Sequence, residues 1–405
     1  MLVLGLSSGA VSVVDERRGT ETFRNNAYDV DLGDDDPLRV SGDRPDYGVC
    51  VATAPDGSGV ASGHCTDAKW RVWNLDGTTR TTKSSRLHGV DSIKYSPNGK
   101  LLAVTGFYWP VDPDNDNALH AENRLEVFDA VTHEHKWGSR SLHSMYHDIP
   151  HTVTFSGDSM YVAVVCQFDS VGFRLTHDGL PQDGQLLLQG IGEFCPTNHA
   201  LFAVATSTHL EMWRPSSRTF EWQVPIGEDR DDDGAHLQNF VRFSPDGDMI
   251  ATRHTPGIEE NAANVCIVDA RNGEELVTLD HGNGHHINDV CFSTDGRKLA
   301  CVGRRDTEQN AYDRSTRGIC VVWDPVEGSK LFTMVYKDPE IRSVAFGRDD
   351  YNLETDRRLA LGATQHAKSG NDGGISRLDA QLIRMILDSD LREWTPSARR
   401  VIEID

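Results

Sequence analysis

Hydrophobic and polar residues alternate along this chain in short runs that recur as one unit. Each unit has an apolar run, a turn of the Ser-Pro-Asp-Gly type, a second apolar run ending in small residues, and a third run that closes on Trp-Asp, Phe-Asp or Val-Asp. The clearest copies begin at Ile93 (IKYSPNGKLLAVTG), Val241 (VRFSPDGDMIATR) and Val290 (VCFSTDGRKLACVG). Short alternating runs cut by Gly, Asp, Asn and Pro predict antiparallel strands. Recurrence from end to end indicates stacked sheet units.

Seven such units follow a partial one in the 405 residues. The partial unit, residues 1–22, supplies only a second and a third strand. The first strands of the others start near Val49, Ile93, Val153, Ile191, Val241, Val290 and Val344. A lone four-stranded sheet cannot bury both of its faces, so we expect the units to pack around a common axis. The prediction is an all-β fold, a single β-propeller of four-stranded antiparallel blades.

The two chain ends predict how the ring closes. Residues 1–22 lack a first strand, and the C-terminal segment 398–404 aligns with the first strand at 341–346. We therefore expect strand 398–404 to complete the N-terminal blade of one domain that spans residues 1–405. This count favours eight blades, and seven remain possible if the unit from Ile191 or the N-terminal fragment is irregular.

The third strands and their turns resemble those of the WD-repeat β-propellers. The best match begins at Val60 (VASGHCTDAKWRVWNLDG), and others begin at Ile319 (ICVVWDPVEG) and Leu125 (LEVFDAVTHE). The resemblance covers nearly the whole chain. It implies a closed propeller, and propellers of this type include both interaction scaffolds and a few enzymes.

The same family often carries a hydrogen-bonded set of His, Ser, Asp and Trp inside a blade. The unit from Val49 keeps three of these four residue types, as Ser62, Asp67 and Trp73. Other units have Phe128, Val268 and Leu378 where Trp would stand. The resemblance therefore identifies a divergent member.

Charge and cysteine usage limit the compartment and the class of partner. The 62 acidic residues against 40 basic ones leave a net charge of −22, which opposes binding to nucleic acid or to anionic membrane. Asp exceeds Glu and Arg exceeds Lys, which fits a high-salt or GC-rich source. Eight cysteines without a C-x-x-C pair indicate reduced thiols, so we expect a cytoplasmic protein. The apolar start is interpreted as two strands joined by a turn.

Longer connections gather between second and third strands, at residues 107–122, 254–264, 304–317 and 364–373. Loops confined to one face usually carry recognition. The first begins with Phe107, Tyr108 and Trp109 beside a run of carboxylates, and aromatic anchors are typical of protein interfaces. These side chains could equally cover their own blade.

Arginines gather in the third of these connections, at Arg304, Arg305, Arg314 and Arg317. Arginine forks suit carboxylate or phosphate groups, so these residues are candidates for binding a partner. The alternative is that they pair with neighbouring carboxylates, including Glu259 and Glu260.

Metal sites have only weak signals. Asp229, Asp231 and Asp233 match the first positions of a calcium loop, but Phe240 stands where a bidentate Glu is expected. Asp112, Asp114 and Asp116 have the same spacing. Histidines cluster at His143, His147 and His151 and at His281, His285 and His286, and hydrogen bonding inside a blade is favoured over zinc binding for them.

No G-x-S-x-G elbow, no phosphate-cradling loop and no H-E-x-x-H sequence occurs. We therefore expect a non-catalytic interaction scaffold, without a cofactor, that binds a protein or peptide through its elaborated loop face. The alternative is a propeller hydrolase or lactonase with a divalent metal in the central channel.

Overall fold

Nearly all of the described residues belong to one of two compact units of the chain. The computed structural model describes residues 1–16, 20–26, 28, 48–108, 122–139, 150–166, 172–180, 190–206, 208–226, 240–254, 262–307, 315–338, 340–347 and 400–404. One unit is Met1–Gly347 with Val401–Asp405, and the other is Arg348–Arg400. Among these residues there is no helix with the length and apolar character needed to cross a membrane.

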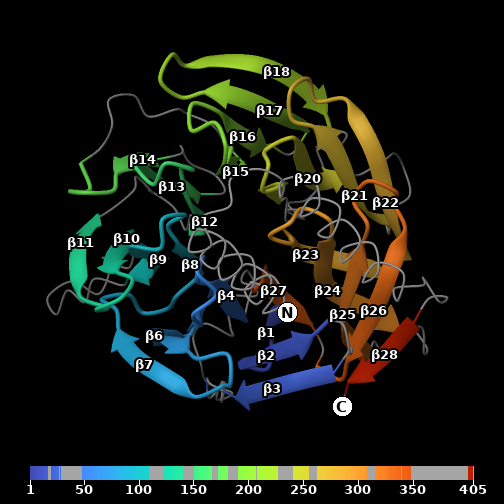
Figure 1. The fold of residues 1–405 in the computed structure, drawn as a ribbon, viewed down its shortest axis with the longest axis horizontal. Helices are drawn as coiled ribbons and strands as arrows, with labels where there is room; N and C mark the ends of the chain where they lie inside the picture. Colours follow the sequence, from blue (N-terminus) through green and yellow to red (C-terminus); the bar gives the residue numbers. More distant parts are fainter. Residues whose placement is uncertain are drawn as a thin grey trace, which may run out of the picture. The chain divides into compact units, whose positions relative to one another are not determined.

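Seven antiparallel sheets make up the described part of the first unit, and they form the blades of a ring (Figure 1). We number them from the N-terminus and give each from its inner to its outer strand. Blade 1 is β27 (Ile341–Phe346), β1 (Leu2–Leu6), β2 (Ala10–Asp15) and β3 (Thr20–Asn26). Blade 2 is β4 (Val49–Thr53), β5 (Val60–His64), β6 (Asp67–Trp73) and β7 (Thr79–Ser84). Blade 3 is β8 (Ser92–Tyr95), β9 (Leu101–Tyr108), β10 (Glu122–Asp129) and β11 (His135–Ser139).

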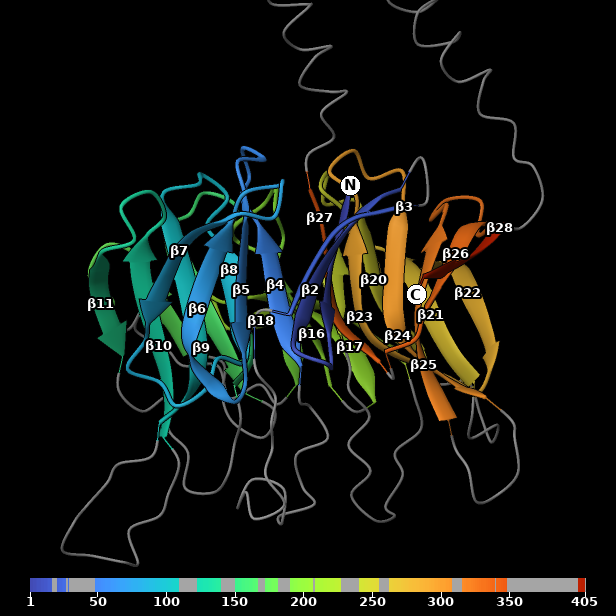
Figure 2. The same ribbon diagram turned by 90° about the horizontal axis from the view of Figure 1, so that it is seen from below.

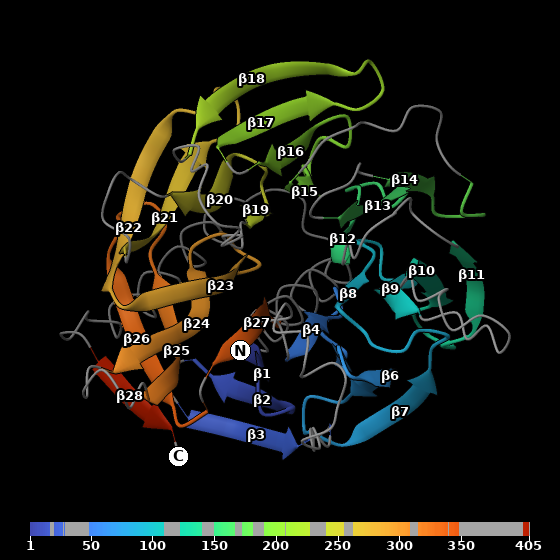
Figure 3. The ribbon, with the colours of Figure 1, turned by 180° about the vertical axis from the view of Figure 1, so that it is seen from behind.

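The remaining four blades continue around the ring (Figure 3). Blade 4 is β12 (Pro150–Phe155), β13 (Tyr161–Cys166) and β14 (Gly172–Leu175). Blade 5 is β15 (Ile191–Phe194), β16 (Phe202–Ala205), β17 (His209–Arg214) and β18 (Thr219–Pro225). Blade 6 is β19 (Val241–Phe243), β20 (Met249–His254), β21 (Ala262–Asp269) and β22 (Glu275–Asn283). Blade 7 is β23 (His285–Phe292), β24 (Leu299–Thr307), β25 (Ser315–Trp323), β26 (Lys330–Tyr336) and β28 (Arg400–Ile404).

The hydrophobic core of the described residues is divided into seven clusters, and each lies between two neighbouring blades. Between blades 7 and 1, for example, Val302 and Met334 pack with Leu2 and Leu4, all fully buried. Seven interfaces between seven blades leave no open end. The alternating apolar residues of each strand therefore serve both faces of its blade, which is why one blade cannot be stable by itself.

The ring closes in blade 1, but through a different strand from the one that the sequence predicted. Strand β1 pairs with β27, with Leu2 opposite Phe346 and Leu4 opposite Val344. The C-terminal strand β28 lies beside β26 at the outer edge of blade 7. The prediction that 398–404 completes the N-terminal blade was therefore wrong. The more general prediction, that a strand from the C-terminal part of the chain completes this blade, was correct. Whether residues 1–405 form a single domain stays a prediction.

The same pairing explains why the described blades number seven and not the favoured eight. The partial unit 1–22 and the unit starting near Val344 were counted as two blades, yet they are the outer and inner strands of one blade. The unit from Ile191 is a regular four-stranded blade despite its unusual turn.

The recurring Ser-Pro-Asp-Gly turn has one local hydrogen-bond pattern. In blade 6 the Ser244 hydroxyl donates to an Asp246 carboxylate oxygen at 2.5 Å and accepts from the Met249 N–H at 2.9 Å. Gly247 then adopts a φ of +76°, which favours glycine. Ser96, Ser156 and Ser293 make the same pair of contacts in blades 3, 4 and 7. The turn is repeated because it satisfies its own buried hydroxyl.

Candidate functional site

The strands of each blade run between two rims of the ring (Figure 2). First strands pass into second strands at the turn rim, where the Ser-Pro-Asp-Gly turns lie. Second strands pass into third strands at the opposite end, which we call the loop rim. The predicted connections 107–122, 254–264 and 304–317 follow β9, β20 and β24, so their described ends lie at the loop rim. The connection 364–373 lies outside the described residues.

Blade 7 carries a long hairpin at the loop rim. Strands β24 and β25 have nine residues each and stay paired as far as Thr307 and Ser315. Arg305 lies opposite His285 of β23 on one side and opposite Arg317 of β25 on the other. Residues directly opposite on neighbouring strands lie on the same face of the sheet, so these three form one row, the basic row.

The two arginines of the basic row have no counter-charge among the residues that the structure describes. Arg305 and Arg317 are exposed, and His285 is half-buried. Neither arginine forms an ion pair with any residue that the structure describes. Like charges on directly opposed residues destabilise a sheet, by an amount of the order of 0.2–1 kcal/mol per pair. An anionic group bound between the two arginines would remove this repulsion.

Arg304 lies on the other face of the hairpin and has a different environment. Its guanidinium is 3.9 Å from an Asp306 oxygen and 4.0 Å from a Glu340 oxygen. Glu340 also binds Arg342 at 2.8 Å. Pairing with neighbouring carboxylates, the alternative weighed from the sequence, thus describes Arg304. Arg305 and Arg317 have no such pairing with a described carboxylate, and Glu259 and Glu260 lie outside the described residues.

Other predicted site residues are described in part or lie outside the described residues. Phe107 and Tyr108 are the last residues of β9, with their backbones opposite Asn123 and Glu122 of β10. The predicted residues that lie outside the described part of the chain are Trp109, Arg314, Asp229, Asp231, Asp233, Asp112, Asp114, Asp116, Glu259 and Glu260.

Charged side chains of the inner strands connect neighbouring blades. A guanidinium nitrogen of Arg242 in blade 6 is 2.7 Å from an Asp289 oxygen in blade 7, and the other Asp289 oxygen accepts the Val344 N–H of blade 1 at 3.2 Å. Glu193 of blade 5 accepts the Phe243 N–H of blade 6 at 2.8 Å. Each of these carboxylates is thus held by a neighbouring blade.

Blade 2 contains the polar set that the family resemblance implied, in altered form. The Trp73 indole N–H donates to the Ser62 hydroxyl at 2.8 Å, and both residues are buried. Asp67 binds Arg71 at 3.3 Å, and Arg71 lies over the Tyr28 ring at 4.2 Å. The predicted residues Ser62, Asp67 and Trp73 therefore belong to one packed region that stabilises the blade.

Tyr28 is the member of this set that sequence reasoning missed. Its hydroxyl lies 2.9 Å from the Ser62 hydroxyl, and burial raises the pKa of Tyr28 well above its usual range. Its ring stacks on His64 with centroids 5.5 Å apart. Tyr28 lies in the connection between β3 and β4. No motif in the sequence marks it, because it is 34 positions away from Ser62 and reaches blade 2 only through the fold.

The histidines and carboxylates in the described ranges are dispersed. Among these residues no group of three or more His, Cys, Asp or Glu side chains could hold a metal ion. His285 and His286 lie at the loop rim, whereas His281 is buried against Trp323, with ring centroids 5.0 Å apart. His143 and His147 lie outside the described residues.

The strand pairing and the hydrophobic cluster between each two neighbouring blades define the architecture. No protein-family model matches this chain, and no curated protein matches it either. The strand order of the described residues is that of a seven-bladed β-propeller.

Proposed function

We propose that this propeller is a non-catalytic interaction module of the WD-repeat type, and that it binds an acidic segment of a protein partner at the loop rim of blade 7. The observation that carries the proposal is the basic row, in which exposed Arg305 and Arg317 oppose each other without a counter-charge among the described residues. Arginine guanidinium groups bind carboxylates through two parallel N–H···O bonds.

The charge of the whole chain strengthens the argument. A net charge of −22 gives the protein a surplus of carboxylates to pair with its arginines. An arginine pair without a counter-charge among the described residues is more informative in such a chain than in a basic protein, because intramolecular partners are abundant. The repulsion between Arg305 and Arg317 is offset when an acidic ligand binds, so binding is favoured at this position.

The scaffold suits this role because the hairpin stands on a rigid blade. The part of the hairpin farther from the loop rim is fixed by the buried residues Cys301, Ile319 and Val321, which pack against blade 6. A preorganised pair of arginines loses little conformational entropy on binding. Arg304 and Arg314 are proposed as neighbouring contributors, and Phe107, Tyr108 and Trp109 as aromatic anchors farther along the same rim.

The test measures binding of a fluorescein-labelled peptide of ten glutamates by fluorescence anisotropy at low ionic strength. We expect saturable binding by the wild type, and at least a tenfold loss of affinity when Arg305→Glu and Arg317→Glu are combined, because two attractive contacts become repulsive. Affinity should also fall steeply as salt is added.

The control is Arg297→Glu, which makes the same type of charge change at an exposed turn of the same blade. It should leave affinity within twofold of the wild type. Equal losses in the control and in the double variant would show a general charge effect and would contradict the proposal that the basic row binds the peptide. No binding by the wild type would have the same consequence.

A further inference from the structure

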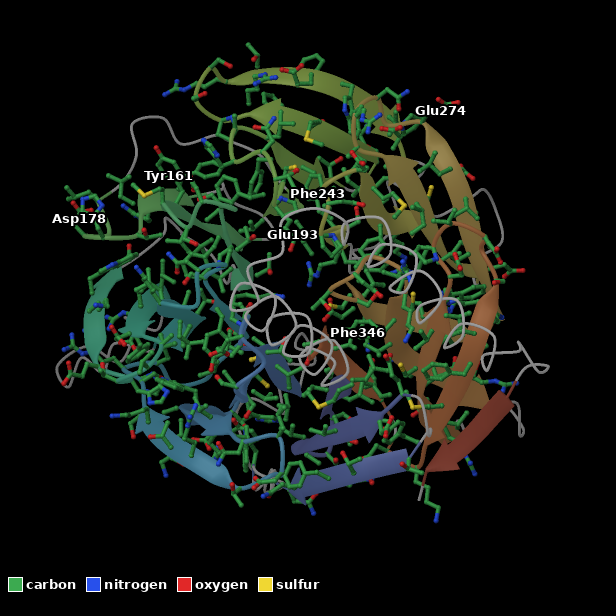
Figure 4. All side chains as sticks on the ribbon, viewed as in Figure 1. Tyr161, Asp178, Glu193, Phe243, Glu274 and Phe346 are labelled. Atoms are coloured by element: carbon green, nitrogen blue, oxygen red, sulfur yellow. The ribbon has the colours of Figure 1, made fainter. Side chains whose placement is uncertain are left out.

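A hollow of about 200 Å³ lies at the turn rim, on the opposite side of the ring from the basic row. It is formed where the inner strands of blades 3, 4, 5 and 6 pass into their turns, and Glu193 and Phe243 lie near the centre of the ring in Figure 4. Pockets for drug-sized ligands have volumes of about 300–1,000 Å³, so this hollow suits a smaller molecule, of the size of a single amino acid.

Most of the residues that line the hollow are aromatic residues or prolines, because the four inner strands end at equivalent positions of the repeat. Each of the four strands ends on an aromatic residue, and a proline or glycine of the following turn stands two positions later. The aromatic residues that line the hollow are Tyr95, Phe155, Phe194 and Phe243, and the turns add Pro97, Gly157, Pro196 and Pro245. Flat rings and prolines of this kind bind an apolar side chain without needing to be ordered first.

Two side chains of opposite charge line the same hollow without contacting each other. Lys94 of blade 3 and Glu193 of blade 5 are both half-buried, and the structure has no ion pair between them. Glu193 accepts the Phe243 N–H with one carboxylate oxygen at 2.8 Å, and its negative charge also acts on the Arg242 guanidinium of blade 6. Its other oxygen accepts no hydrogen bond from a described residue.

Of these two side chains, Lys94 is the one without a counter-charge among the described residues. It forms no hydrogen bond or ion pair with any described residue. A half-buried cation without a partner is unfavourable, because it has lost part of its hydration.

We infer that this hollow binds a free apolar or aromatic α-amino acid as its zwitterion. The carboxylate of the ligand pairs with Lys94, its ammonium binds the available oxygen of Glu193, and its side chain packs on the aromatic and proline walls. This arrangement gives Lys94 a counter-charge and gives the second oxygen of Glu193 a hydrogen-bond donor. A ligand without a carboxylate would leave Lys94 without a counter-charge, and a ligand without an ammonium would not use the second oxygen of Glu193, which is the basis of the selectivity.

The experiment is isothermal titration calorimetry of the full chain with L-phenylalanine, L-leucine and L-methionine. We expect saturable binding of at least one of them. For the tightest ligand, removal of one charge should weaken binding at least tenfold, as tested with N-acetyl-L-phenylalanine and phenethylamine for phenylalanine, or with the corresponding N-acetyl acid and amine for the other two.

Two variants separate the roles of the charges. Lys94→Gln and Glu193→Gln should each weaken binding at least tenfold. In Glu193→Gln the amide oxygen of the new side chain can still accept the Phe243 N–H, so the backbone contact is kept. The exposed Lys100→Gln on the neighbouring turn should bind like the wild type. Circular dichroism and thermal melting verify that each variant is folded.

The inference is overturned if none of the three amino acids binds saturably, or if both Lys94→Gln and Glu193→Gln bind as tightly as Lys100→Gln. It is independent of the proposed function. Peptide binding at the basic row can fail while amino-acid binding at the turn rim persists, and the reverse.

Discussion

At the residue scale, the buried polar groups of the described residues differ in whether they have partners. Ser62 has two, because it accepts the Trp73 indole N–H and contacts the Tyr28 hydroxyl. His281 has none in the described part of the chain, and both of its ring nitrogens are buried beside Trp323. A buried group that cannot form hydrogen bonds favours its neutral state, so His281 makes stability depend on pH.

The pKa of His281 lies at about 3 instead of 6.5, chiefly because burial disfavours its charged form, with the charges of His285 and Lys330 acting in the same sense. Between these two values the unfolded chain binds a proton that the folded chain does not. The stabilising contribution of the neutral ring is therefore complete above pH 6.5 and is lost as the pH falls toward 3. From pH 7 to pH 5 the loss amounts to about 2 kcal/mol at most.

Urea unfolding at pH 7 and pH 5 tests this prediction. In His281→Phe, which keeps an aromatic ring beside Trp323, the decrease in stability between the two pH values should be smaller than in the wild type by up to about 2 kcal/mol. The exposed His177→Gln serves as control and should behave like the wild type. An unchanged pH dependence in His281→Phe would contradict the assignment.

At the scale of the element, the small residues that end the second strands have a structural cause. In blades 1, 3 and 7 a glycine of the second strand lies against a carbonyl of a first strand or of the segment that leads into one. A Cβ atom would lie 1.9 Å from the Val49 oxygen at Gly5, 1.9 Å from the Gly89 oxygen at Gly106, and 1.8 Å from the His286 oxygen at Gly303. The recurrent glycine therefore permits close approach of two backbones.

Gly303→Ala should accordingly destabilise the protein by about 1–3 kcal/mol, because the backbone of β23 or β24 has to move to accommodate the methyl group. The measurement is chemical denaturation followed by circular dichroism. Gly138→Ala in the outer strand β11 is the matched control, since its Cβ would lie 3.3 Å from the nearest atom. Similar losses in both variants would indicate a general effect of glycine replacement in strands.

At the scale of the whole molecule, ring closure depends on β27 and not on the C-terminal strand. Val344 of β27 is buried between blades 1 and 7, and its strand pairs with β1. Strand β28 pairs at the outer edge of blade 7, away from this junction. Disrupting β27 opens the ring, whereas removing β28 leaves all seven described interfaces in place.

We therefore expect Val344→Asp to lower stability by about 3 kcal/mol or more, because it places an unpaired carboxylate in the junction. Deletion of residues 400–405 should lower it by much less. Differential scanning calorimetry of the two variants beside the wild type measures both effects. A larger loss of stability from the deletion than from Val344→Asp would indicate that the C-terminal strand closes the ring.

The sequence predicted part of the candidate site at the loop rim and none of the hollow at the turn rim. Arg305 and Arg317 could be named from the sequence because they lie close together in one connection between strands. The sequence could not separate them from Arg304, since that depends on which face of the hairpin each side chain occupies. Lys94 and Glu193 were not predicted at all, because they are 99 positions apart and only the packing of the blades brings them to the same hollow.

The sequence by itself determined the strands, their turns and the propeller architecture, because these follow from local alternation and from turn residues such as Ser244 and Gly247. It also indicated that a strand from the far end of the chain completes the N-terminal blade. Only the tertiary structure decided that β27 is this strand and that the described blades number seven. Segments 341–346 and 398–404 have similar apolar patterns, and the choice between them depends on packing between blades 7 and 1, which no local pattern encodes.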